Sequence, residues 1–287
     1  MIEAEGVHPD KTVEVAGKSI APIILGTSRV ATEKLPDGSF VPKRDHDDWE
    51  IEILKYALSQ GFNSIDTARS YGDAEVIVGK AIQGLTRKKL LIATKVGMQF
   101  VDPAGLRREI EESCDRLGTV PDLVYLHNRH EGHMGEEMDL LIEELNNAVD
   151  AGMAGRVGIS NFRPDELRRA INVSRHKIIA YQAKVNIVNP RQDYKELDQV
   201  CRENKIHFIA SSSLDRGKVI DIAVADEIST LMSKYELTTA QLGLLTVLLK
   251  GILPIVQSHD REHIKQNIGV LDKVVSADDI AKLAALM

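Results

Sequence analysis

The sequence predicts an α/β fold, a TIM (β/α)8 barrel of parallel strands preceded by an N-terminal β-hairpin. From Pro22 onward, short apolar runs alternate eight times with amphipathic helical segments. Runs such as LLIAT, DLVYL and HFIA are apolar throughout, which is typical of parallel strands covered on both faces. No GxGxxG turn follows an early strand, so the alternative of a doubly wound sheet is disfavoured.

The first elements are a hairpin and a long loop. Residues 11–25 predict a hairpin that turns at Ala16-Gly17, followed by a first strand that ends at Leu25-Gly26. The polar stretch 27–46 is long for a connection inside a compact domain and predicts a lid or binding loop.

The remaining elements alternate regularly. The predicted strands are 63–66, 90–95, 123–127, 156–160, 180–185, 207–211 and 253–256. The predicted helices are 47–60, 74–83, 103–117, 136–151, 164–174, 194–204, 219–235, 239–250 and 261–270. Pro103 after Asp102, and Pro164 before two acidic residues, are typical helix starts.

Composition narrows the function classes. With 287 residues and 43% hydrophobic residues, the pattern favours a single domain over residues 1–287. The chain has 36 Lys and Arg against 43 Asp and Glu, a net charge of −7, so we expect no nucleic-acid partner.

The sequence also bears on the location of the protein and on metal binding. No apolar run approaches the roughly 18 to 20 residues of a membrane span, and the acidic N-terminus does not resemble a signal peptide. We therefore expect a cytoplasmic protein without a membrane partner. Cys114 and Cys201 lie in predicted helices without a CxxC neighbour, which indicates reduced thiols and no metal site. The oligomeric state is not indicated.

Titratable residues end three successive predicted strands. Asp66, Lys95 and His127 occupy these positions, and Tyr71 follows Asp66 by five residues in a predicted loop. Because the carboxyl ends of TIM-barrel strands form the catalytic face, we expect the four side chains to lie together.

These four residue types suit acid–base catalysis. A phenol has an unperturbed pKa of about 10, and a nearby ammonium favours the phenolate. Lys95 can supply that charge, Asp66 can hold Lys95, and His127 can orient a carbonyl by donating a hydrogen bond. Each residue alone has an ordinary structural explanation, whereas their shared position favours a site.

The sequence around these residues resembles the aldo-keto reductase family. The matching segments are GFNSIDTARSYGDAEVIVGKAIQG, IATKVG and DLVYLHN, and the resemblance runs from about Val13 to Leu271. It implies hydride transfer between a nicotinamide cofactor and a small carbonyl or alcohol. The implied cofactor is NADP(H), with NAD(H) not excluded. The implied roles are Tyr71 as general acid/base, Lys95 and Asp66 as its tuning pair, and His127 as the orienting residue.

The resemblance also implies cofactor contacts. GRVGISNF and AYQAKVNIVNPR resemble the segments that hold the nicotinamide carboxamide, here through Ser160, Asn161 and Gln182, with Asn186 and Arg191 in family-like spacing. A helix N-cap is the structural alternative for the SNF segment. IVQSHDREHIKQN resembles the segment that binds the adenosine 2′-phosphate, and its matching residues are Ser258, Gln266 and Asn267.

Three positions depart from the family pattern. Ser211 stands where the family usually has an aromatic ring that stacks on the nicotinamide. Gln257 and His263 stand where it usually has cations that bind the phosphate, although Arg261 and Lys265 offer charge nearby. Glutamine and neutral histidine cannot reproduce the paired hydrogen bonds of a guanidinium.

The chain ends at LAALM, after a predicted terminal helix, where many relatives continue into a loop that closes the pocket. This ending predicts a more open site whose specificity depends on residues 27–46.

Three functions remain open from the sequence. The first is a nicotinamide-dependent carbonyl reductase or alcohol dehydrogenase. The second is a redox-neutral acid–base enzyme (dehydratase, cyclase or isomerase) with weakened cofactor binding. The third is a binding or regulatory subunit that has kept the four residues. The substrate is not indicated.

Overall fold

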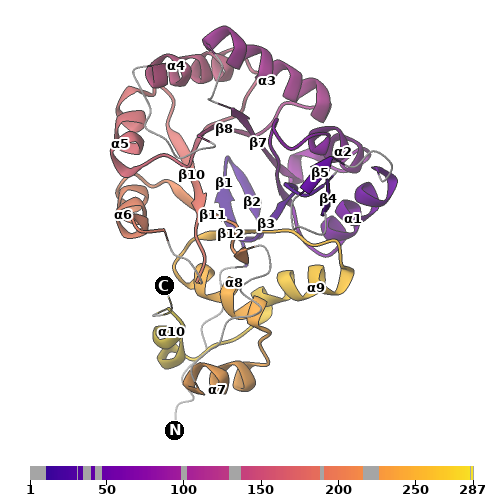
Figure 1. The fold of residues 1–287 in the computed structure, drawn as a ribbon, viewed down its shortest axis with the longest axis vertical. Coiled ribbons are helices and arrows are strands. Elements are labelled where there is room, and N and C mark those ends of the chain that lie inside the picture. Colours follow the sequence, from indigo (N-terminus) through magenta and orange to yellow (C-terminus); the bar gives the residue numbers. More distant parts are fainter. Residues whose placement is uncertain are drawn as a thin grey trace.

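Eight described strands form a closed parallel barrel with helices around it (Figure 1). The computed structural model describes residues 11–30, 32–34, 40–42, 47–97, 102–128, 137–187, 191–215, 226–284 and 286. The barrel strands follow one another in chain order, and the last pairs with the first. They are β3 (Ile24–Gly26), β6 (Ser64–Asp66), β7 (Leu91–Gly97), β8 (Leu123–His127), β9 (Val157–Ser160), β10 (Ile178–Lys184), β11 (His207–Ser211) and β12 (Leu253–Val256). The predicted fold class is confirmed.

Helices separate the strands along the chain. They are α1 (Asp47–Ser59), α2 (Ala74–Ala81), α3 (Pro103–Leu117), α4 (Glu137–Asp150), α5 (Pro164–Val173), α6 (Tyr194–Glu203), α7 (Asp226–Tyr235), α8 (Thr239–Leu249), α9 (Arg261–Gly269) and α10 (Ala277–Ala284). Short 3₁₀ turns, η1 (Arg87–Lys89) and η3 (Val270–Asp272), precede β7 and α10. None of the helices that the structure describes combines the length and the apolar character that a membrane crossing needs.

Most predicted boundaries lie within one or two residues of the observed ones. The start of α3 has the predicted form, since the Asp102 carboxylate accepts from the Gly105 N–H at 2.6 Å and Pro103 follows it. The helix predicted over 219–235 is observed from Asp226, and residues 219–225 lie outside the described residues. Helix α10 extends into the LAALM segment as far as Ala284.

The barrel interior is a packed core. Apolar side chains from alternating positions of the strands point inward, and they include Ile24, Leu91, Ala93, Leu123, Tyr125, Ala180, Ile209 and Leu253. Because these residues lie below the strand ends that carry Asp66, Lys95 and His127, they fix the height at which the polar side chains emerge.

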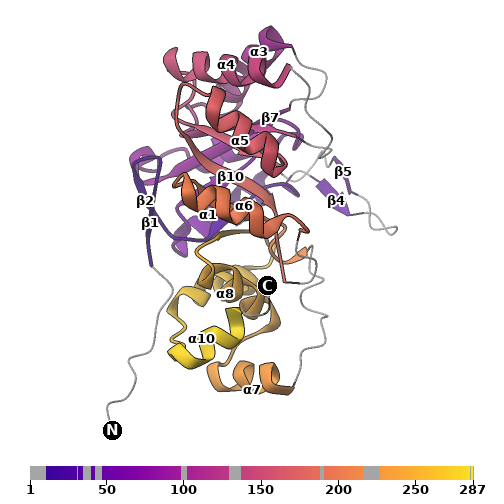
Figure 2. The same cartoon turned by 90° about the vertical axis from the view of Figure 1, so that its left-hand side faces the viewer.

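The N-terminal hairpin closes one end of this interior. Strands β1 (Val13–Val15) and β2 (Lys18–Ile20) pair antiparallel, and Ala16 and Gly17 turn with φ of 53° and 76°, as predicted. Val15 and Ile20 pack on the inward-facing barrel residues. Lys18 Nζ lies 2.7 Å from the Asp122 carboxylate, which joins the hairpin to the loop before β8. Figure 2 shows β1 and β2 at one end of the barrel and β4 and β5 at the other.

The expectation that 27–46 is all loop is wrong in one respect. It contains two short antiparallel strands, β4 (Thr32–Lys34) and β5 (Phe40–Pro42), with Thr32 opposite Pro42 and Lys34 opposite Phe40. Three-residue strands leave no alternating apolar pattern in the sequence, so the periodicity gave no signal for them.

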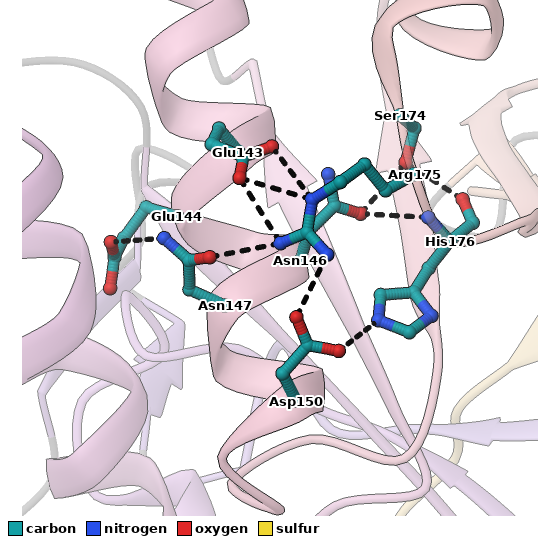
Figure 3. Close-up of polar contacts among 8 residues, drawn as sticks. All are labelled: Glu143, Glu144, Asn146, Asn147, Asp150, Ser174, Arg175 and His176. Carbon is teal, nitrogen blue, oxygen red and sulfur yellow. Dashed lines mark hydrogen bonds and ion pairs between the residues drawn. The ribbon is translucent and has the colours of Figure 1, made fainter.

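A polar network holds α4 against the segment that leads into β10 (Figure 3). Arg175 donates to Glu143 at 3.1 Å and to Asp150 at 2.9 Å, and His176 lies 2.7 Å from the other Asp150 oxygen. The Asn146 side chain accepts from the His176 N–H at 3.1 Å. Hydrogen bonds from Arg175 and His176 lower the pKa of Asp150. Exposed ion pairs stabilise a fold little, so the network chiefly orients the entry to β10.

Gly79 permits a close approach between α2 and α3. A β-carbon at this position would lie 2.8 Å from the carbonyl oxygens of Arg116 and Leu117, which are backbone atoms and cannot yield as a flexible side chain would. We expect Gly79→Ala to lower the free energy of unfolding by about 1–3 kcal/mol through overpacking.

Urea denaturation would measure this loss. Gly269→Ala is the matched control, because Gly269 also lies in a helix but a β-carbon there meets no atom within 4 Å. The control should be neutral or slightly stabilising, since alanine has the better helix propensity. Equal midpoints for the two variants would contradict the role given to Gly79.

Candidate active site

Adjacent barrel strands bring three of the predicted residues to one rim. β6, β7 and β8 are neighbours in the barrel, with Asp66 opposite Ala93 and Gly97 opposite His127. Asp66 and His127 are the last residues of their strands, and Lys95 lies two residues before the end of β7.

Lys95 is the centre of the cluster. Its Nζ donates to Asp66 Oδ2 at 2.5 Å, to the Thr67 carbonyl oxygen at 2.8 Å and to the Tyr71 hydroxyl at 3.4 Å. The ammonium also lies 4.9 Å from the centroid of the Tyr71 ring. Burial opposes the charge, but Asp66 and Tyr71 outweigh it and raise the pKa of Lys95 above its ordinary value of 10.5. Lys95 is therefore a cation beside a phenol at neutral pH.

Tyr71 is held by a tight turn between β6 and α2. The Thr67 and Arg69 N–H groups donate to the Ala93 and Lys95 carbonyl oxygens of β7, both at 2.9 Å. The Tyr71 N–H donates to the Ala68 carbonyl oxygen at 3.0 Å. These bonds fasten the turn to the strand that carries Lys95, which brings the phenol beside the ammonium.

His127 and Ser160 lie side by side, but only one lines the cavity described below. Both end their strands, β8 and β9, in register with each other. His127 is 8% exposed and lines the cavity, whereas Ser160 is buried and does not. Ser160 therefore lies beside His127 at the strand ends, and its contact with a cofactor stays a prediction.

The SNF segment is not a helix N-cap. The cap of α5 is Arg163, whose N–H donates to Glu166 at 2.9 Å. Asn161 instead has a left-handed φ of 65°, and its side-chain amide donates to the Asn128 carbonyl oxygen at 3.0 Å. This conformation, which asparagine tolerates better than most residues, turns Asn161 toward the cavity.

Gln182 joins the cluster through a contact that spacing could not predict. Its Nε2 donates to Asp66 Oδ1 at 2.8 Å, so both carboxylate oxygens of Asp66 have partners. Below them, the phenol of Tyr125 is fully buried, which raises its pKa, and it has a side-chain hydrogen bond with Gln182.

One cavity of about 990 Å³ extends from this cluster to the residues near α9 that are predicted to bind the adenosine 2′-phosphate. Its size is at the upper end of the roughly 300–1,000 Å³ typical of small-molecule and cofactor sites. Of the predicted residues, those that line it are Asp66, Tyr71, His127, Asn161, Gln182, Ser211, Gln257, Ser258, His263, Gln266 and Asn267. A single long ligand could therefore reach from Tyr71 to α9.

Several other predicted side chains lie elsewhere. Arg261 stacks over the Tyr56 ring at 4.9 Å, and neither it nor Lys265 lines the cavity. Asn186 donates to the Ser212 carbonyl oxygen at 3.2 Å, and Arg191 pairs with Asp193 at 2.5 Å. These contacts give Asn186 and Arg191 structural roles outside the cavity lining.

Thr27, Ser28 and Arg29 also line the cavity, at the start of the stretch 27–46 that the sequence predicts to be a lid or binding loop. The Arg29 N–H donates to Gln257 Oε1 at 3.0 Å. The Gln257 side chain thus holds the turn after β3 and also faces the cavity. The wall formed by the end of α7 and the start of α8 adds Met232, Leu237, Thr238, Thr239 and Ala240. Periodicity predicts these helices but not which cavity they border.

Comparisons with known proteins agree with the fold and the motifs. Residues 22–287 match the sequence model of the aldo/keto reductase family. The chain is 30% identical to methylglyoxal reductase DkgB of Escherichia coli O157:H7, over 84% of this chain and 88% of that protein.

Two solved structures are similar over nearly the whole chain. A thermostable aldo-keto reductase, Tm1743, in complex with the inhibitor epalrestat, has a TM-score of 0.83 and 26% identity, covering 96% of this chain and 99% of that one. An aldo/keto reductase from Klebsiella pneumoniae in complex with NADP and acetate has a TM-score of 0.80 and 25% identity, covering 96% and 95%.

Proposed function

The chain belongs to the aldo/keto reductase family of oxidoreductases, and from that premise we propose that it transfers a hydride between NADP(H) and a small carbonyl or alcohol, with Tyr71 as general acid/base. The observation that carries the proposal is the contact between the buried Lys95 ammonium and the Tyr71 hydroxyl at the wall of a cofactor-sized cavity.

The geometry supports a distinct role for each residue of the cluster in the direction of carbonyl reduction. The Tyr71 hydroxyl donates its proton to the carbonyl oxygen, and the Lys95 ammonium stabilises the negative charge left on the phenol oxygen. Asp66 keeps Lys95 charged and oriented through the bond at 2.5 Å. His127 donates a hydrogen bond to the same carbonyl oxygen. When bound, NADP(H) supplies the hydride.

The residues that would hold the cofactor line the same cavity. Ser258, Gln266 and Asn267 offer hydroxyl and amide groups at the end near α9. Asn161 and Gln182 offer amides beside the acid–base cluster, where a nicotinamide would lie. The Klebsiella pneumoniae relative binds NADP. This relationship, together with the size and polarity of the cavity, supports NADP(H), and the test includes NAD(H) for comparison.

Cofactor binding can be followed through Trp49, the only tryptophan of the sequence. Its ring contacts His259 at 5.1 Å between centroids, and His259 follows Ser258, which lines the cavity. We expect NADPH to quench Trp49 fluorescence with saturation, and a parallel titration with NADH measures how much the 2′-phosphate adds to the affinity, since Gln257 and His263 stand where the family usually has cations. No binding of either cofactor at millimolar concentration would refute the proposal.

Ser211 favours a second candidate. It lines the cavity at the end of β11, where the family usually has an aromatic ring against the nicotinamide. A redox-neutral dehydration, cyclisation or isomerisation needs only the proton-transfer cluster. It predicts turnover without nicotinamide, and strict dependence on reduced cofactor would exclude it.

A further inference from the structure

Helix α3 contacts the turn that carries Tyr71 from the outside of the barrel. It packs on α2 so closely that Gly79 has no room for a β-carbon. This packing places two successive turns of α3, at Glu112 and Arg116, beside the segment 69–75. Neither residue lines the cavity, so neither can touch the substrate.

Arg116 makes three contacts with the segment. Its guanidinium donates to the Gly72 carbonyl oxygen at 2.6 Å and to the Asp73 carboxylate at 3.0 Å. Its Nε lies 3.4 Å from the carboxylate of Glu75, which is fully buried and accepts a hydrogen bond from Thr94 at 2.7 Å. One side chain therefore links α3, the residue after Tyr71, the start of α2 and strand β7.

A second ion pair holds the segment on the other side of Tyr71. Glu112, four residues before Arg116 and hence on the same face of α3, forms an ion pair with Arg69. The segment is thus fixed at Arg69 and at Gly72, and Tyr71 lies between the two points. Gly72 has a left-handed φ of 61°, so its carbonyl orientation depends on what holds it.

We propose that Arg116 is a positioning residue for proton transfer: by holding the Gly72 carbonyl, it sets the place of the Tyr71 hydroxyl relative to Lys95 and the carbonyl oxygen of the substrate. The inference rests on the proposed role of Tyr71. The contact from Lys95 to Tyr71 is long, at 3.4 Å, and a small shift of the backbone at Gly72 would break it.

Replacing Arg116 tests the proposal. We expect Arg116→Met to lower kcat by about 10- to 100-fold, with KM and the cofactor Kd changed by no more than about twofold, because misplacement of a reacting group costs rate and not binding. Arg116→Lys keeps a cation beside Glu75 but loses the planar fork, so it should restore part of kcat. Arg108→Met, at an exposed position of the same helix, is the matched control and should behave as the wild type.

Two further variants separate a folding defect, and the role of Tyr71 itself, from the role of Arg116. If Arg116→Met does not fold, adding Glu75→Gln removes the unpaired buried carboxylate and keeps an acceptor for Thr94. Tyr71→Phe in parallel separates the two proposals: an active Tyr71→Phe refutes the role of Tyr71. If Tyr71→Phe is inactive while a folded Arg116 variant keeps the wild-type kcat, only the positioning role is refuted. Equal losses in kcat and in cofactor affinity in Arg116→Met would also overturn the positioning role.

Discussion

Replacing Tyr71 with phenylalanine is expected to lower kcat by about 100- to 10,000-fold, the usual contribution of a positioned general acid. The ring of Tyr71 is partly buried against a cluster of core apolar side chains, and phenylalanine keeps that packing. Only the hydroxyl at 3.4 Å from Lys95 is lost. Steady-state reduction of an aldehyde panel with NADPH would measure the change.

The affinity for the cofactor and the melting temperature should stay close to the wild-type values in this variant. Tyr56→Phe is a suitable control, because its ring lies under Arg261 on the outer helix α1 and that stacking needs no hydroxyl. An undiminished kcat in Tyr71→Phe would leave the proposed mechanism without its acid.

Lys95→Met is expected to abolish turnover and to lower the free energy of unfolding by about 3–5 kcal/mol, the cost of leaving one partner of a buried ion pair alone. Asp66 is 4% exposed and would keep only the Gln182 hydrogen bond. The double variant Lys95→Met/Asp66→Asn should regain much of the stability and none of the activity. Urea unfolding and activity assays on the same preparations would show both effects. A single variant as stable as the wild type would contradict the pairing.

The same ion pair gives stability a defined pH dependence. Because folding raises the pKa of Lys95 above 10.5, the stabilisation is fully present below the pKa of the unfolded chain and is lost as the pH rises through the folded pKa. The pair therefore weakens only in strongly alkaline solution, and wild type and Lys95→Met should converge in stability there.

The sequence predicted the barrel because its signals are local. Each apolar run is a strand buried on both faces, and proline with an acidic neighbour marks the start of α3 and α5. The rim at Asp66, Lys95 and His127 followed from the same rule, since parallel strands end on one face. Strands β4 and β5 were missed because three residues are too few for a period.

The rest of the site depends on contacts between distant segments. The bond from Gln182 to Asp66 joins residues 116 positions apart, and no spacing rule foretells it. Ser160 is buried at the end of β9, beside His127, and its contact with a cofactor stays a prediction. Nothing in the sequence indicates the contact of Arg116 with Gly72, which forms where α3 packs closely on α2 at Gly79.

The hairpin at the base of the barrel has a kinetic consequence. Val15 and Ile20 fill that end with apolar side chains, and Lys18 fastens it to Asp122. In the part of the chain that the structure describes, the hairpin therefore leaves no passage along the barrel axis to the cavity. Under the proposed function, substrate and product would share the opening on the opposite face, so a bound product would block the next substrate. We expect the reaction product to inhibit competitively with its own substrate.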